Sequence, residues 1–215
     1  MAISLQKGQS IILKEKDNKL KNIKVCLGWD PKKDKGGFLS SLLTDFLHGL
    51  VDRDESEFDL DASAFLVSNK KVREIIYFAH LYNASKTVVH GGDNLTGRGK
   101  ILDKEQIKVD LQNLPTDIDS IYFAVNIYQA RFRKQNFGMI DNAFIRIVNI
   151  ETEEEFCRYD LSAKNYAENE AMLFGALKRD HKNNDEWNFE ACGEGIMHGS
   201  AINEIKPMIE KIINK

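Results

Sequence analysis

Phe58–Asp–Leu–Asp–Ala–Ser–Ala–Phe–Leu–Val67 is the stretch that decides the fold, because its residues alternate with a period of two. That period is the repeat of a β-strand. One face of the strand would carry Leu60, Ala62, Ala64 and Leu66, and the other Asp59, Asp61, Ser63 and Phe65. Two carboxylates then point the same way at the start of the strand, where they repel unless a cation or water separates them. Asp59 and Asp61 are therefore candidate cation ligands; the alternative is a solvated strand end.

Short stretches of the same kind recur about every eight to twelve residues, with turn signals between them. They are Ile3–Leu5, Ser10–Leu13, Asn22–Leu27, Ile75–His80, Thr87–His90, Gln106–Leu111, Ile121–Tyr128, Ala143–Asn149, Glu155–Leu161, Ala171–Lys178 and Trp187–Cys192. This spacing predicts a mainly β protein, an antiparallel β-sandwich. Ile121–Tyr128 is an almost unbroken apolar run, interrupted by Asn126, and predicts a central strand buried on both faces.

Two helices are expected within this β-rich chain. Residues 31–57 differ from their surroundings, and apolar side chains at helical spacing predict an inserted helix over Phe38–Leu50. That helix would pack on the sandwich or, alternatively, dock a partner or a second copy. Ser200–Ile213 predicts a C-terminal helix, kinked or starting late because of Pro207. We predict a single domain over residues 1–215, with the helical insertion at 31–57 and the C-terminal helix at 199–215.

A glycine-rich loop rich in oxygen donors follows the strand that ends at His90. It reads His90–Gly–Gly–Asp93–Asn94–Leu95–Thr96–Gly97–Arg98–Gly99 and runs on to Asp103 and Glu105. Its glycines allow tight turns, so several oxygens could converge on one point, as Ca²⁺ requires. Asp30, in Gly28–Trp–Asp–Pro31, is a candidate third carboxylate; its alternative role is to cap its own turn.

Composition favours a globular protein of the cytoplasm. The chain has 215 residues, 42% hydrophobic and 29% charged, with a formal net charge of −3, which gives no general attraction to nucleic acid. Three cysteines without close pairing fit reduced thiols, and neither a signal-peptide core nor an apolar run of roughly 20 residues is expected from the sequence. The basic loop Arg131–Asn136 could touch phosphates but is more simply a solvated turn.

Several motifs, in order, resemble the TerD family of tellurite-resistance and stress proteins. They are Phe58–Phe65, His90–Gly97, Glu105–Leu111, Gln135–Asn149, Arg158–Leu161, Met172–Gly175 and the strand at Trp187. The resemblance covers Ile3 to about Gly195. It implies a β-sandwich that binds one or two Ca²⁺ ions in acidic loops at one end. It also implies protein partners in a stress-response complex, some of them membrane-linked.

Carried over position by position, the resemblance implies a definite set of metal ligands. They are Asp30, Asp59, Asp61, Asp93, Asn94, Leu95, Thr96, Gly97, Asp103 and Glu105, with Asn136 and Asn142 as weaker candidates. Two departures stand out. Family members carry an acidic run after the glycine loop, whereas this chain has Arg98, Lys100, Ile101 and Leu102. Residues 31–57 replace a short link, so their role is not implied by the family.

Enzymatic motifs give no support to catalysis. Neither a nucleophile elbow nor a phosphate-binding loop is present, and the five histidines show no pair at zinc-ligand spacing. We therefore expect a non-enzymatic calcium-binding protein. The alternative is a metal-dependent hydrolase, or a binder of a nucleotide or other small ligand, using the same loops.

Overall fold

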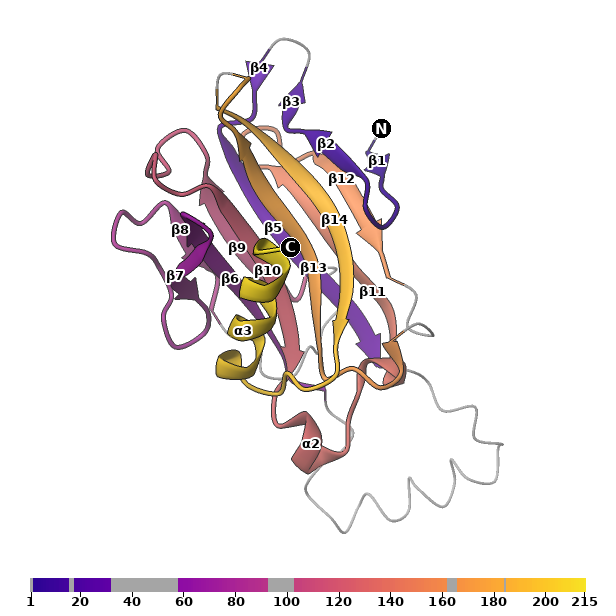
Figure 1. Ribbon diagram of the computed structural model, residues 1–215. Coiled ribbons are helices and arrows are strands. Elements are labelled where there is room, and N and C mark those ends of the chain that lie inside the picture. Colours follow the sequence, from indigo (N-terminus) through magenta and orange to yellow (C-terminus); the bar gives the residue numbers. More distant parts are fainter. Residues whose placement is uncertain (1, 16–17, 32–57, 93–102, 162–165, 184) are drawn as a thin grey trace.

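The computed structural model describes residues 2–15, 18–31, 58–92, 103–161, 166–183 and 185–215, and its strands form two facing six-stranded sheets (Figure 1). The first sheet has the order β1-β12-β11-β5-β9-β8, and the second β2-β14-β13-β10-β6-β7. The strands of the first sheet are β1 Ile3–Ser4, β12 Glu155–Asp160, β11 Ile140–Asn149, β5 Asn22–Pro31, β9 Glu105–Asp110 and β8 Val88–His90. Those of the second are β2 Ser10–Ile12, β14 Glu186–Ile196, β13 Ala171–Asp180, β10 Ser120–Ile127, β6 Leu60–Ser68 and β7 Lys71–Ile76. A separate hairpin joins β3 Lys14–Glu15 to β4 Asn18–Lys19.

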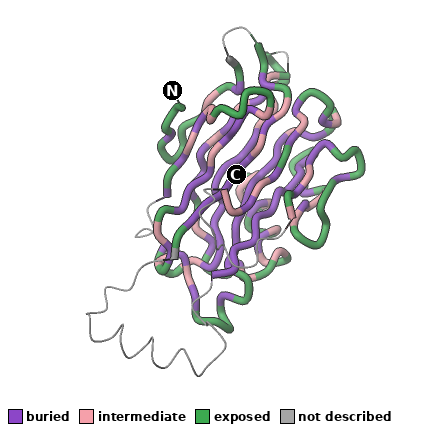
Figure 2. Tube along the Cα trace, turned by 180° about the vertical axis from the view of Figure 1, so that it is seen from behind, coloured by how far each residue is buried: buried purple, intermediate pink, exposed green. Residues whose placement is uncertain are grey.

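This arrangement confirms the mainly β sandwich expected from the sequence. Its ladders are antiparallel, except that β1 pairs in parallel with β12, where Ile3 lies opposite Cys157. The predicted central strand is also confirmed. Every residue of β10 is buried, and β10 lies between β6 and β13. Figure 2 shows that buried residues run along the strands, whereas exposed residues lie mainly in the turns.

The alternation along β6 places its side chains on two faces, as predicted, and the structure shows an apolar cluster on each face. Leu60, Ala62, Ala64 and Leu66 belong to the core between the sheets. Phe65 belongs to a second cluster on the outer face of the second sheet, together with Ile205 and Ile209 of helix α3, Ile202–Ile213. Both isoleucines are fully buried. The predicted C-terminal helix is therefore present, and it covers that outer face.

Pro207 lies inside α3 rather than at its start. It is on the exposed side of the helix, so the backbone hydrogen bond that it removes faces water.

Several local assignments differ from the sequence analysis. β5 continues past Leu27 to Pro31, where a turn was expected. β7 spans Lys71–Ile76 instead of Ile75–His80, because Asn69 and Lys70 both adopt positive φ and turn the chain directly after β6. β14 continues through Gly193 to Ile196, where a break had been expected at Cys192. The basic loop contains a short helix, α2 Ala130–Arg133, followed by the 3₁₀ turn η1 Phe137–Met139.

The expected helix Phe38–Leu50 falls outside the described residues. In the insertion as bounded from the sequence, only Pro31 is described, and it is the last residue of β5. Within the described parts of the chain, no helix has the length and apolar character needed to span a membrane.

Candidate metal centre

One end of the sandwich gathers the strand ends that carry the predicted ligands (Figure 1). β5 ends there at Pro31 and β8 at His90, while β6 begins at Leu60 and β9 at Glu105. The ladders fix this arrangement, since Leu27 of β5 lies opposite Glu105, and Leu60 lies opposite Ile127 at the end of β10. Segments 32–57 and 93–102 are therefore both flanked by described residues at this end.

Asp59 and Asp61 are both buried, with exposed fractions of 9% and 6%. The Asp61 carboxylate accepts a hydrogen bond from Asn126 Nδ2 at 3.4 Å, across the β6–β10 ladder. Arg133 Nη2 lies 3.9 Å from Asp59 Oδ2. Asn126 Oδ1 is buried and has no hydrogen-bond partner in the described part of the chain. Carboxylates and an amide oxygen withdrawn from water favour a countercharge or donor beside them.

His90 and Glu105 form a buried pair at the same end, with side chains only 1% exposed. His90 Nε2 lies 3.3 Å from Glu105 Oε2 and 3.2 Å from the carbonyl oxygen of Ala62. The backbone N–H of Gly92 donates to His90 Nδ1 at 3.1 Å. Because a backbone N–H can only donate, the Nδ1 atom is an acceptor and the ring proton lies on Nε2. The imidazole is therefore neutral and ties the start of the glycine loop to β6, next to Asp61.

Asp103, a predicted ligand, is held by an arginine on the outer face of the first sheet. Arg146 donates to it through Nε at 2.8 Å and Nη2 at 2.6 Å, and through Nη1 to Glu155 at 3.0 Å. These bonds, chiefly those that Arg146 donates to Asp103, raise the pKa of Arg146. Burial, and then the negative charge of Asp103, raise the pKa of the neighbouring Cys26 thiol to about 12. Asp103 therefore already has a cation, and it would contribute to a metal site only through lone pairs that Arg146 leaves available.

Asp30 lies in β5 rather than in a turn, and its carboxylate is exposed. Asn142 Nδ2 donates to it at 2.9 Å from a bulge in the β11–β5 ladder. Asn136, the other weaker candidate, accepts from Gly138 N at 3.0 Å and so caps η1. Its oxygen is thus engaged in a local turn.

Asp93, Asn94, Leu95, Thr96 and Gly97 lie outside the described residues, so their placement stays a prediction. Within the described ranges, no three histidine, cysteine, aspartate or glutamate side chains are grouped so that they could hold a metal ion. Asp59, Asp61 and Glu105 offer only hard oxygen donors, which suits Ca²⁺ rather than zinc. This donor set fits calcium if segment 93–102 supplies further oxygens.

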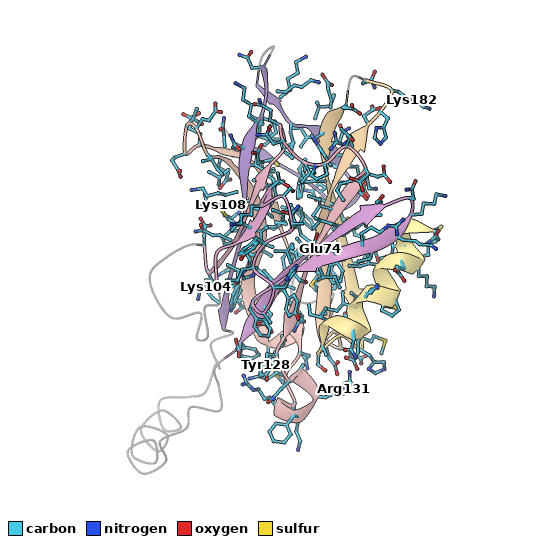
Figure 3. All side chains as sticks on the ribbon, turned by 90° about the vertical axis from the view of Figure 1, so that its left-hand side faces the viewer. Glu74, Lys104, Lys108, Tyr128, Arg131 and Lys182 are labelled. Carbon is cyan, nitrogen blue, oxygen red and sulfur yellow. The ribbon has the colours of Figure 1, made fainter. Side chains whose placement is uncertain are left out.

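Sequence reasoning missed three side chains at this end: Asn126, Arg133 and Arg146. Asn126 left a signal, because it is the one polar residue inside an apolar strand. Lys104, labelled with Tyr128 in Figure 3, lies at this end too, with Nζ 5.7 Å from the centre of the buried Trp29 ring. Positive side chains therefore adjoin the carboxylates on more than one side.

Comparison with known protein families identifies the family of this chain. The family described as the TerD domain matches residues 1–205. The chain belongs to the TerD family. General stress protein 16U of Bacillus subtilis (strain 168) is 42% identical over 205 residues, which cover 94% of each chain. The tellurium resistance protein TerD of Serratia marcescens is 39% identical over the same share of both chains.

Solved structures show the same fold at low sequence identity. A TerD homologue from Streptomyces coelicolor A3(2), titled a homologue of telluride resistance protein, aligns with a TM-score of 0.59 at 18% identity and covers 83% of this chain and 92% of its own. A crystal structure of a protein of unknown function, SAV2460, aligns with a TM-score of 0.65, also at 18% identity, over 88% and 97%. The TerD sandwich is thus shared well beyond the close relatives.

Proposed function

We propose that this TerD-family protein is a non-enzymatic, calcium-binding interaction module of the cytoplasmic stress response. Its family is one of tellurium resistance and general stress proteins. One or two Ca²⁺ ions would be held by oxygens from β6, from the glycine loop and from the start of β9. In support, the donors described at this end are oxygens, and Gly92 N–H already engages His90 Nδ1. Arg146 and Arg133 contact two of the proposed ligands, Asp103 and Asp59, so a bound ion would share these carboxylates with the arginines.

The observation that carries the proposal is the burial of Asp59 and Asp61 at the strand start beside both ends of the glycine loop. A bound cation would offset the repulsion between two carboxylates removed from water. Its ligands come from chain segments about 30 residues apart or more, so the ion would cross-link β6 to the β8–β9 connection. Binding would then stabilise the folded state by mass action.

The expected partners are proteins of a stress-response complex. Relatives named for stress and for tellurium resistance support this only through their names. The apolar stripe over Phe38–Leu50, in the insertion that departs from the family pattern, is the segment that we expect to contact a partner or a second copy. We propose no catalytic step, since carboxylates that bind Ca²⁺ are poor general acids.

Isothermal titration calorimetry of the metal-stripped protein with calcium chloride tests the proposal. We expect binding tighter than about millimolar. The double variant Asp59→Asn and Asp61→Asn keeps the side-chain size and removes both charges, and we expect it to weaken binding by about a hundredfold or more.

The matched control is Asp117→Ala with Glu151→Ala, which removes two exposed carboxylates at the opposite end of the sandwich. Its affinity for calcium should equal that of the wild type. Full calcium affinity in the Asp59/Asp61 variant, or no heat of binding in the wild type, would show that the proposed ion site is wrong.

A further inference from the structure

Helix α2 presents an aromatic ring to solvent at the same end of the molecule. Phe132 is 86% exposed, more than any other large hydrophobic side chain in the described ranges. Figure 1 shows α2 projecting beyond the ends of the strands. A depression of about 370 Å³, lined by Gln129, Arg131, Phe132 and Ser200, lies beside the ring. Exposure of the Phe132 ring to water is unfavourable, and contact of the ring with an apolar phase would remove this cost.

The turn that carries Phe132 is rigidly held. Ala130 is fully buried beneath it, and the residues at both ends of α2, Gln129 and Lys134, adopt left-handed backbone conformations. Arg131 Nε donates to Glu170 at 3.0 and 3.1 Å, and its Nη2 donates to Glu204 of α3 at 2.5 and 2.6 Å. The ring is therefore presented in a fixed position, which lowers the entropy cost of binding through it.

The charged side chains of the segment that carries Phe132 are all positive. Residues 127–140 contain Arg131, Arg133 and Lys134 and no acidic residue. The Arg131 charge is taken up by Glu170 and Glu204, and Arg133 lies near Asp59 and over the ring of Tyr128, 5.6 Å from its centre. Lys134 is exposed and makes no ion pair with the described residues. Lys134 is therefore the cation beside the ring that can approach an anionic surface.

We propose that α2 is a lipid-surface anchor, in which Phe132 enters the interface of a bilayer and Lys134 contacts anionic headgroups. The projecting shape of α2 favours a lipid bilayer as the partner. A single projecting ring beside a cation suits an interfacial lipid layer, whereas a protein partner of ordinary affinity would bury a broad surface of about 800 Å². This anchor does not depend on the proposed calcium site.

Co-sedimentation with vesicles tests the anchor. Phosphatidylcholine vesicles containing phosphatidylserine are compared with pure phosphatidylcholine vesicles, in calcium chloride or in EDTA, whichever gives tighter binding of the wild type. We expect binding to the anionic vesicles that weakens about tenfold in Phe132→Ala and about tenfold in Lys134→Glu. Phe78→Ala removes a partly exposed aromatic elsewhere, and Lys182→Glu inverts an exposed charge at the opposite end (Figure 3); both should bind as the wild type does.

A fluorescent variant reports insertion directly. Both native tryptophans, Trp29 and Trp187, are buried, so the emission of Phe132→Trp contains an exposed indole that should shift to the blue on anionic vesicles. The proposal is overturned if the wild type binds neither vesicle or both equally, or if Phe132→Ala binds anionic vesicles like the wild type. It is also overturned if Phe132→Ala instead converts a wild-type dimer to a monomer in sedimentation, because the ring would then be a contact between copies.

Discussion

Replacing His90 by phenylalanine should destabilise the protein through the buried polar groups that the imidazole now serves. The ring is retained, so little cavity forms, and the loss comes from hydrogen bonding. The carbonyl of Ala62 would lose its hydrogen-bond donor at 3.2 Å. The Glu105 carboxylate would lose a contact with the same nitrogen at 3.3 Å, which is not a hydrogen bond. A buried carbonyl deprived of its donor costs about 1–3 kcal/mol, whereas the N–H of half-buried Gly92 can form a hydrogen bond to water instead. We expect a loss of about 2 kcal/mol.

Urea denaturation in EDTA, followed by the fluorescence of the two buried tryptophans, measures this difference without any contribution from a bound cation. For a chain of this length, about 2 kcal/mol corresponds to a fall of roughly 4–8 °C in the melting temperature. Circular dichroism on heating provides the second measurement.

His80→Phe is the matched control, because His80 also pairs with a glutamate, Glu74, at 2.9 Å. That pair is solvent-exposed, with the His80 side chain 50% accessible, so its loss should change stability by less than about 0.5 kcal/mol. If His90→Phe lowers stability by under about 1 kcal/mol, or no more than His80→Phe does, the imidazole does not hold the loop to β6 in the way we describe.

Three further predictions follow from packing and charge. The cysteine thiols, each with a pKa raised to about 12 by burial, should resist alkylation at pH 8 in the native state and react once the chain is unfolded; they are Cys26, Cys157 and Cys192. Gly175→Ala should lower stability by about 1–3 kcal/mol in urea denaturation, because the new methyl group would lie 2.6 Å from the Phe189 ring; a wild-type midpoint would mean that the ring moves aside freely. The hydrogen bond from Arg131 lowers the pKa of Glu204, so this carboxylate contributes stability above its ordinary value near 4.5 that is lost as pH falls through its lower folded-state value. Glu204→Gln should therefore flatten the acid limb of a plot of stability against pH, and an unchanged acid limb would contradict this.

Much of the fold follows from patterns within single segments. The two faces of β6 and the buried character of β10 could be predicted because alternation and apolar runs are local properties. The position of β7 could not, because its turn uses Asn69 and Lys70 in positive φ, where a glycine would have been the usual signal. The short helix α2 was hidden for the same reason, since left-handed Gln129 and Lys134 bound it.

In the candidate site, too, some residues could be predicted from a single segment and others could not. Asp59 and Asp61 are visible in the sequence because they alternate on one strand. The His90–Glu105 pair and the Arg146–Asp103 bond join residues 15 and 43 positions apart, and only the pairing of strands brings them together. Asp103 thus carried the residue type of a metal ligand, while its bidentate arginine partner lay on another strand, β11.

The central position of β10 means that different parts of this protein will exchange amide hydrogens with solvent on separate timescales. β10 is paired with β6 over Ser120–Ile127 and with β13 over Ser120–Asn126, and both of its faces are covered. Its protected amides should exchange only through global opening, while those beside the strand ends exchange through local fluctuations. In deuterium-labelling mass spectrometry, the exchange rate of a peptide from this strand would report unfolding of the whole molecule. Slower exchange at either end of the sandwich, caused by a bound ion or surface, could then be measured separately from that global rate.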